Sequence, residues 1–285
     1  MIKSLSIVIP AKNESLSIVN LISGILSVVE NAEVIVVNDG SSDNTGELAE
    51  KAGALVVHHP YSKGNGAAIK SGSRVASGTV IVFMDADGQH DPKDIPRLLE
   101  KMEEGYDLVV GARGRESQAS LGRGLANGLY NKLASYMTGH AVKDLTSGFR
   151  AVRREKFLEF LYLLPNGFSY PTTSTMAFFR AGYSVAYVRI TAHDRKGVSH
   201  IRPLKDGIRF LLIIFKIGTL YSPLKLFVPL AFFVFLFGLG YYGHTYFSSG
   251  RFTNMSALMF TTSLTIFLVG LVSEQITALT YKERD

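Results

Sequence analysis

Short apolar runs alternate with segments of helical spacing along the first part of the chain. The apolar runs predict strands, and they cover residues 5–9, 34–37, 54–57, 80–84 and 108–111. Between them, apolar residues recur every three or four positions, which predicts helices at 15–29, 66–76 and 92–102. The predicted apolar face of the first helix consists of Leu16, Val19, Ile22, Ile25, Leu26 and Val29. Strands that alternate with helices predict an α/β domain with a mostly parallel sheet and helices on both faces.

Two long uncharged stretches dominate the C-terminal part. No charged residue occurs at 226–250 or at 252–273, and each stretch supplies the roughly 20 apolar residues that a membrane-spanning helix needs. A pair of buried core helices is the alternative, but the core helix of a water-soluble domain usually keeps a polar stripe. We therefore expect a transmembrane hairpin with helices at about 224–246 and 253–276.

Basic residues flank the predicted hairpin on one side of the membrane. The connector at 244–254 holds one arginine, whereas a basic stretch precedes the first span and Lys282 and Arg284 follow the second. Because basic segments tend to remain in the cytoplasm, we expect the N-terminal domain and both termini there. The predicted protein is thus an integral membrane protein, with the plasma membrane of a prokaryote as the favoured location.

The positive charge of the chain is concentrated in one stretch. The 30 Lys and Arg residues exceed the 24 Asp and Glu residues by six, yet residues 1–194 and 226–285 are each neutral. Residues 195–225 carry seven basic residues and one acidic residue. A nucleic-acid-binding surface, which would spread basic residues more widely, is not expected. Residues 203–222 combine basic residues with an apolar face, which predicts an amphipathic helix in the membrane interface. Packing of this helix against the domain itself is the alternative.

Composition excludes several classes of protein and site. An apolar fraction of 47% is too high for a disordered chain, and the absence of cysteine excludes disulfides, thiolate metal sites and a cysteine nucleophile. The seven histidines are scattered singly, so a zinc site is not expected. The apolar run that ends at Pro10 is too short for a signal peptide and predicts a buried first strand.

Polar motifs follow three of the predicted strands at the point where each strand ends. They are Pro10–Glu14, Asn38–Asp43 and Asp85–His90. The carboxyl ends of parallel strands share one edge of a sheet, which is where ligands bind in such domains. Carboxylates at that edge can hydrogen-bond a nucleoside and hold Mg²⁺, whose remaining ligands are water and phosphate oxygens. Turn formation and helix capping are the alternative for these residues, above all for Asn38–Asp43.

The motifs together resemble family-two glycosyltransferases with the Rossmann-like GT-A fold. The similar segments are Ile7–Glu14, Val37–Asp43, Lys63–Gly72 and Met84–His90. The segment Asp144–Arg150 and the basic stretch before the hairpin resemble the polyprenyl-phosphate branch of that family, which includes dolichol-phosphate mannose synthase. The resemblance implies a membrane-bound inverting glycosyltransferase that moves a sugar from GDP-mannose or a UDP-hexose to dolichyl or undecaprenyl phosphate. The product would be a lipid-phosphate-linked sugar for glycan assembly.

The resemblance also implies roles for particular residues. Asp87 and Gln89 would bind Mg²⁺ or Mn²⁺, and Asp87, Arg113, Arg123 and Asp144 would act in catalysis. Residues implied at the nucleotide sugar are Pro10, Ala11, Asn13, Glu14, Val37, Asp39, Lys63, Asp85, Ala86, Asp87, Gln89, Arg113, Arg195 and Arg202. Residues implied at the lipid phosphate are Arg123, Ser147 and Arg150.

Two of these residues have alternative roles. Asp144 is expected either to orient or deprotonate the acceptor or to cap the turn before Phe149. Arg150 is expected either to hold Asp144 or to meet a phosphate. Lys196 and His200 would assist the loop that carries Arg195 and Arg202.

The sequence predicts three consecutive parts and leaves other functions open. The parts are a GT-A domain at 1–202, the interface helix at 203–222 and the hairpin at 223–285, through which a homo-oligomer is possible. The chain has no tryptophan, which disfavours polysaccharide synthases with a Gln-x-x-Arg-Trp motif. A transferase acting on a lipid hydroxyl or a glycan acceptor remains an alternative, as does a catalytically silent membrane scaffold. The intact Asp85-x-Asp87 pair argues against the scaffold.

Overall fold

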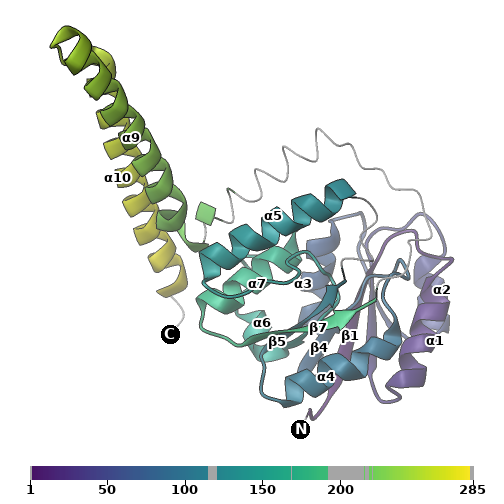
Figure 1. Cartoon of the computed structure of the whole chain (residues 1–285). Coiled ribbons are helices and arrows are strands. Elements are labelled where there is room, and N and C mark those ends of the chain that lie inside the picture. Colours follow the sequence, from purple (N-terminus) through teal and green to yellow (C-terminus); the bar gives the residue numbers. More distant parts are fainter. Residues whose placement is uncertain are drawn as a thin grey trace. The chain divides into compact units, whose positions relative to one another are not determined.

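The structure is a computed structural model that describes residues 2–114, 121–167, 169–191, 215, 218, 219 and 221–282. Of residues 121–126 and 280–282 it describes the backbone alone. The chain divides into two compact units, Met1–His200 and Ile201–Asp285, which are described separately (Figure 1). The expected interface helix at 203–222 lies almost entirely outside the described residues.

The first unit is built on a twisted sheet of seven described strands in the order β3-β2-β1-β4-β6-β5-β7. These strands are β1 (Leu5–Ala11), β2 (Glu33–Asn38), β3 (Leu55–His58), β4 (Val80–Phe83), β5 (Leu108–Arg113), β6 (Arg150–Arg153) and β7 (Val185–Ile190). Strand β6 runs antiparallel to both of its neighbours, whereas the other described pairs are parallel. The predicted mostly parallel α/β sheet is therefore confirmed, and β6 and β7 are strands that the apolar pattern did not predict.

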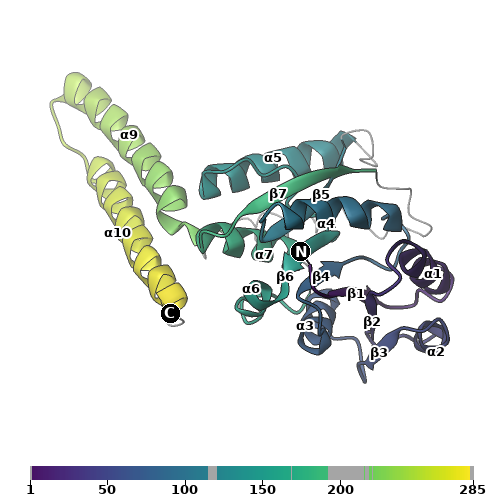
Figure 2. The same ribbon diagram turned by 90° about the horizontal axis from the view of Figure 1, so that it is seen from below.

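Helices cover both faces of the sheet (Figure 2). The described helices of this unit are α1 (Ile18–Val28), α2 (Thr45–Lys51), α3 (Asn65–Val75), the short 3-10 helix η1 (Pro92–Asp94), α4 (Ile95–Glu103), α5 (Leu121–Thr138), α6 (Arg154–Leu158) and α7 (Tyr170–Arg180). Alternate residues of β1 point to opposite faces. Ile7 and Ile9 meet α1 and α4, whereas Val8 faces α3, where a Cβ atom on Gly72 would lie 2.4 Å from Val8 Cγ1. Glycine at 72 thus lets α3 lie directly on the sheet.

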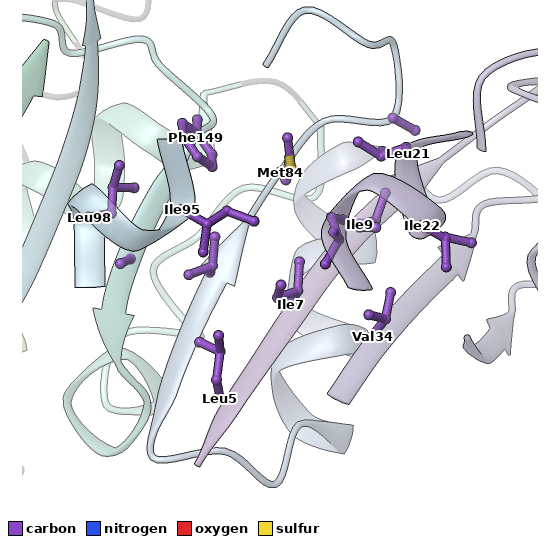
Figure 3. Close-up of a cluster of buried hydrophobic side chains, with 14 of the residues drawn as sticks. Leu5, Ile7, Ile9, Leu21, Ile22, Val34, Met84, Ile95, Leu98 and Phe149 are labelled. Atoms are coloured by element: carbon purple, nitrogen blue, oxygen red, sulfur yellow. The ribbon is translucent and has the colours of Figure 1, made fainter. Parts of the chain in front are cut away.

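The main core lies between the sheet and helices α1 and α4 (Figure 3). Ile22 and Ile95 from the two helices pack with Ile7, Ile9 and Met84 from β1 and the end of β4. Burial of such side chains contributes about 1.5–3 kcal/mol each to the stability of the fold. The core therefore fixes the ends of β1 and β4, from which two of the polar motifs project.

The apolar face predicted for the first helix is partly wrong. Helix α1 buries Ile18, Leu21, Ile22 and Ile25, whereas Leu16 is 96% exposed and Val19 is also exposed. Residues 14–17 form a turn in which Ser17 N and Ile18 N both donate to Glu14 O. Leu16 therefore precedes the helix, and the buried face includes Ile18 and Leu21 in place of Leu16 and Val19.

The second unit contains two long apolar helices, α9 (Pro223–Ser249) and α10 (Asn254–Lys282), which form a hairpin as predicted. Both are long and apolar enough to cross a membrane, with a mean hydropathy of 2.0 over their most apolar windows. Ser263 Oγ donates to Ala231 O at 2.8 Å between the two helices. Phe232, Phe233 and Phe237 are exposed, so these helices expose apolar side chains in the way that suits contact with lipid.

Candidate active site

A cavity of about 430 Å³ opens beyond the carboxyl ends of β1, β2 and β4. It is lined by Pro10, Ala11, Lys12, Glu14, Asp39, Ser62, Gly64, Asn65, Ala68, Asp85, Ala86 and Asp87. Seven of the residues implied at the nucleotide sugar are among them: Pro10, Ala11, Glu14, Asp39, Asp85, Ala86 and Asp87. Lys12, Ser62, Asn65 and Ala68 were not singled out in the sequence. Val37, another implied residue, is buried within β2 instead.

The loop after β1 is fastened to the loop after β2. Asn13 adopts a left-handed backbone with a φ of 55°, and its Oδ1 accepts a hydrogen bond from Ser42 N at 2.8 Å. Ser15 N donates to Asp43 Oδ2, and Thr45 N donates to Asp43 Oδ1. Burial alone would raise the pKa of Asp43, but the hydrogen bonds from Thr45 and Ser15 outweigh it and lower the pKa. Asn13 and Asp43 thus hold the two loops together.

Asp39 lies at the cavity wall with both carboxylate oxygens hydrogen-bonded. Oδ1 accepts from His59 Nδ1 at 2.7 Å and Lys63 N at 2.8 Å, and Oδ2 accepts from Ser62 Oγ at 2.8 Å and Gly64 N at 2.9 Å. Burial by itself would raise the pKa of Asp39, but these hydrogen bonds lower it to about 2. Lys63 thus contributes its backbone N–H at this position.

The β3–α3 loop brings the N-terminus of α3 to the cavity. Gly64 has a φ of 100° and directly precedes α3, so it occupies a left-handed conformation that glycine adopts readily. A Cβ atom on Gly66 would lie 2.0 Å from Pro165 O, which leaves space for no other residue. Gly64 thus makes the turn that opens α3, and Gly66 lets the first turn of α3 lie against the backbone of Pro165.

Asp85 and Asp87 lie on the loop that follows β4. Ser17 Oγ donates to Ala86 O at 2.7 Å, and Asp87 Oδ1 accepts from Gln89 N at 3.2 Å. Among the described residues no group of three or more His, Cys, Asp or Glu side chains converges as a metal cage. The two carboxylates in an open cavity suit Mg²⁺, which keeps several water or phosphate ligands. Asp87 therefore fits a metal held jointly by protein and ligand, and the backbone of Gln89 orients its carboxylate.

Arg113 at the end of β5 forms a bidentate ion pair with Asp144. Arg113 Nε donates to Asp144 Oδ2 at 2.8 Å, and Nη2 donates to Oδ1 at 3.0 Å and to Thr146 Oγ1 at 2.7 Å. Asp144 also accepts from Thr146 N and Ser147 N. Burial favours the neutral form of each group, yet the ion pair outweighs it, raising the pKa of Arg113 and lowering that of Asp144. Asp144 thus both caps the turn before Phe149 and orients Arg113.

Arg150 and Ser147 are buried rather than exposed to a ligand. Arg150 Nη1 donates to Pro171 O and Ser174 Oγ at 2.8 Å each, and Nη2 donates to Ser147 O. No direct bond from Arg150 to Asp144 occurs in the described residues, and neither residue 147 nor residue 150 is accessible. The structure therefore places Arg150 inside the fold, where it joins β6 to α7, and not at a phosphate. The reason is that β6 inserts between β4 and β5.

His90 is a residue of this region that the sequence did not single out. Its ring stacks on Phe149 with a centroid distance of 5.1 Å and an interplanar angle of 19°. Burial lowers the pKa of His90 to about 4, although the nearby Asp87 acts in the opposite direction. The stack connects the Asp85–His90 loop to the loop that contains Asp144. The feature of the sequence that could have indicated His90 is its position as the last residue of the Asp85–His90 motif.

Several implied residues lie beyond what the structure describes. Arg123 belongs to α5, but its side chain is not among the described ones. Arg195 and Arg202, with Lys196 and His200, lie outside the described residues. Their expected roles at the phosphates therefore remain predictions.

Comparison with sequence families identifies both units. The family described as glycosyl transferase family 2 matches residues 6–161, and the GtrB C-terminal hairpin matches residues 222–279.

Curated relatives include two proteins of Haloferax volcanii. Glycosyltransferase AglJ is 30% identical over 82% of this chain and 78% of its own length. A dolichyl-phosphate hexose transferase is 31% identical over 71% of this chain and 89% of its own. An undecaprenyl-phosphate 4-deoxy-4-formamido-L-arabinose transferase of Proteus mirabilis is 36% identical over 54% of this chain and half of its own length.

Solved structures show the same fold as the first unit. Glucosyl-3-phosphoglycerate synthase from Mycobacterium tuberculosis, in complex with Mn²⁺, UDP and glucosyl-3-phosphoglycerate, is 26% identical with a TM-score of 0.60. The match covers 75% of this chain and 78% of that one. The family expected from the motifs is thus confirmed. The chain belongs to glycosyl transferase family 2 and is a glycosyltransferase with a GT-A-like domain and a GtrB-type C-terminal hairpin.

Proposed function

We propose that this protein transfers a sugar from a nucleotide-diphosphate sugar to a polyprenyl phosphate at a membrane. The observation that carries the proposal is the cavity with Asp39, Asp85 and Asp87 on its wall, in a chain that also carries two membrane-length helices. The names of the dolichyl- and undecaprenyl-phosphate transferases among the relatives support the same acceptor class. The proposed donor is GDP-mannose or a UDP-hexose, and the assay below distinguishes them.

The donor binds in the cavity in this proposal. Lys12, Asp39 and the N-terminus of α3, which line the cavity, would surround the nucleoside. Asp85 would lie near the ribose or the base, and Asp87 near the diphosphate. Asp87 would hold a Mg²⁺ or Mn²⁺ ion, with the side chain of Gln89 as the next ligand. When bound, such an ion neutralises charge on the diphosphate, and complexes of glucosyl-3-phosphoglycerate synthase with Mn²⁺ and with Mg²⁺ support this choice.

The acceptor needs little activation, because a phosphate monoester with a second pKa near 6 is mostly dianionic at neutral pH. Its oxygen attacks the anomeric carbon as the bond from that carbon to the diphosphate oxygen breaks. The configuration inverts, and the nucleoside diphosphate leaves. The enzyme must therefore supply alignment and relief of charge repulsion more than a strong base.

In this proposal Arg113 would supply that relief, and Asp144 would hold the Arg113 side chain in position. The low pKa of Asp144 and its ion pair to Arg113 make its carboxylate a weak base. A hydroxyl acceptor would need a stronger base, so the arrangement favours a phosphate. We propose that Arg123, Arg195 and Arg202 add further positive charge around the two phosphate groups.

The hairpin would anchor the enzyme where the lipid acceptor is found. Helices α9 and α10 have the length and apolar character to cross the bilayer. Basic residues before α9 and after α10 favour a cytoplasmic location for both termini. The catalytic unit would then meet nucleotide sugars in the cytoplasm and the lipid phosphate at the membrane surface.

The test is a panel of radiolabelled nucleotide sugars given to the full-length protein in detergent with Mg²⁺ and either undecaprenyl or dolichyl phosphate. Label that moves into the lipid phase with one donor supports the proposal and names donor and acceptor together. The matched variants are Asp87→Ala, which should lose transfer, and Glu104→Ala, a surface carboxylate that pairs with Lys101 and should leave transfer intact. No lipid label with any donor, from protein that is folded, would overturn the proposal.

A further inference from the structure

Two adjacent histidines at the end of β3 face in opposite directions. His58 is half-exposed, and its Nε2 contacts Glu50 Oε1 at 3.0 Å. His59 is buried, and its Nδ1 contacts Asp39 Oδ1 at 2.7 Å with both side chains under 10% exposed. The other ring nitrogen of His59, Nε2, lies 2.8 Å from Ser71 Oγ in α3. A chain of hydrogen bonds therefore runs from α3 through His59 to the carboxylate on the cavity wall.

The direction of this chain follows from the chemistry of its members. An ionised carboxylate only accepts hydrogen bonds, so His59 Nδ1 carries a proton and donates it toward Asp39. The Ser71 hydroxyl both donates and accepts, so it pairs with Nε2 in either state of the ring. The ring is thus held at both nitrogens, which fixes its orientation and with it the position of Oδ1.

The Asp39 carboxylate is saturated by its four partners. A carboxylate has about four acceptor positions, two on each oxygen. His59 and Lys63 N occupy the two on Oδ1, and Gly64 N and Ser62 Oγ occupy the two on Oδ2. A ligand donor can reach Asp39 only by replacing one of them.

The four donors differ in how easily they are replaced. His59 is buried, and the N–H groups of Lys63 and Gly64 belong to the backbone turn that opens α3. Ser62 is exposed, and its hydroxyl can rotate away into water at little cost. The position that a ligand can take is therefore the one that Ser62 holds on Oδ2.

We propose that His59 is a positioning residue of the donor site, which holds the Asp39 carboxylate in place. Asp39 Oδ2 then offers a single acceptor position to an N–H or O–H donor of the nucleoside. The Ser62 hydroxyl fills that position until the nucleoside replaces it. This rests on the proposed function, since it takes the cavity to be the site of the donor nucleotide. His59 does not touch the reacting atoms and acts through Asp39 alone.

The test measures binding of UDP and of GDP, each with Mg²⁺, to the full-length protein in detergent by isothermal titration calorimetry. His59→Ala should weaken binding of the preferred nucleotide about tenfold to a hundredfold, the range expected for a lost hydrogen bond to a charged group. His59→Asn keeps an N–H near the Nδ1 position and should bind within about threefold of the wild type. His59→Gln places its amide near the Nε2 position and should not rescue binding. His58→Ala is the matched control and should bind like the wild type.

Two further measurements separate positioning from a general structural role. In the transfer assay His59→Ala should raise the KM for the nucleotide sugar and leave the KM for the lipid phosphate unchanged. Ser62→Ala removes the competing donor and should tighten nucleotide binding by about twofold to threefold. Circular dichroism melts show which variants are folded. If His59→Ala is unfolded, the comparison of His59→Asn with His59→Gln carries the test.

Each outcome decides one of the two proposals. Failure of the wild type to bind either nucleotide would contradict both the assignment of the cavity as the donor site and the proposed function. Nucleotide binding that is unaffected by His59→Ala, rescued equally by Asn and Gln, or weakened by Ser62→Ala would overturn the role of His59 and Ser62 alone. An equal rise in the KM of donor and acceptor would do the same.

Discussion

The backbone of Gly148 lies directly against the carboxylate of Asp85. A Cβ atom at position 148 would be 2.6 Å from Asp85 Oδ2 and 3.2 Å from Asp85 Cγ. The Tyr170 hydroxyl donates to Gly148 O at 3.0 Å and so holds the backbone of this loop in place. The loop that carries Asp144 and the carboxylate loop of the cavity thus meet at one point that only glycine fits.

Gly148→Ala is therefore expected to lower sugar transfer about a hundredfold, because a shift of roughly 1 Å at a reacting centre has an effect of that size. The new methyl group must displace either Asp85 or the loop. The measurement is kcat/KM for transfer to polyprenyl phosphate. Gly128→Ala is the control, since it lies on α5 with open space around its Cβ position. Transfer by Gly148→Ala at the wild-type rate would show that the contact has no catalytic importance.

The Arg113–Asp144 pair predicts strongly non-additive mutations. If Asp144 acts by orienting Arg113, Asp144→Ala should reduce kcat/KM in the wild type but add little once Arg113 is alanine. Each single variant is expected to lose about tenfold to a hundredfold, the effect of a lost charged hydrogen bond. Losses that multiply in the double variant would instead favour an independent role for Asp144, such as a general base.

Removal of divalent metal should abolish donor binding without unfolding the protein. Treatment with EDTA is expected to eliminate the calorimetric signal of the nucleoside diphosphate, and added Mg²⁺ or Mn²⁺ should restore it. In Asp87→Ala the metal should have little effect, whereas Glu104→Ala should respond like the wild type. Full donor binding in EDTA would contradict a metal at Asp87.

Acid should remove the stability that Asp39 contributes. Its pKa is about 2 in the folded protein against an ordinary value of 3.8, so the unfolded chain binds its proton first as the pH falls. The contribution is complete above pH 3.8 and declines as the pH falls toward 2. The measurement is the difference in unfolding free energy between the wild type and Asp39→Asn, followed by circular dichroism. A difference that stays constant down to the lowest pH would contradict the hydrogen-bonded carboxylate.

Packing between α9 and α10 depends on Gly270. A Cβ atom there would lie 2.6 Å from Phe227 Cβ, so Gly270→Ala must separate the helices locally. We expect the variant to lose about 1–3 kcal/mol of stability in detergent, as for other overpacked sites. Gly243→Ala in α9 has open space at its Cβ position and is the control. Equal stability of the two variants would show that this close approach is not needed.

The alternation of apolar runs and helical spacing was enough to predict the first five strands and the α/β class. It predicted the hairpin too, because an uncharged helix of that length has few other places to lie than a membrane. The motifs after β1, β2 and β4 were correctly expected to meet, since parallel strands end at one edge. The family resemblance then named seven residues that line the cavity.

Local pattern was insufficient where contacts join distant segments. Strand β6 has the sequence Arg-Ala-Val-Arg, which shows no apolar run, and it forms because Arg150 pairs in register with Phe83 of β4 and Val110 of β5. That insertion buries Arg150, which was predicted to contact either Asp144 or a phosphate. The buried face of α1 differed for a related reason, because the turn at 14–17 delays the start of the helix.

The sequence by itself thus determined the first five strands, three of the helices that accompany them, the membrane hairpin and the strand ends at which polar residues gather. These features follow from local periodicity and from the chain's own connectivity. Only the tertiary structure decided which partners each polar group has: Asp39 with His59, Asp144 with Arg113, and Gly148 against Asp85. The physical reason is that a buried polar group takes the nearest suitable donor or acceptor, and folding brings that group from a distant part of the chain.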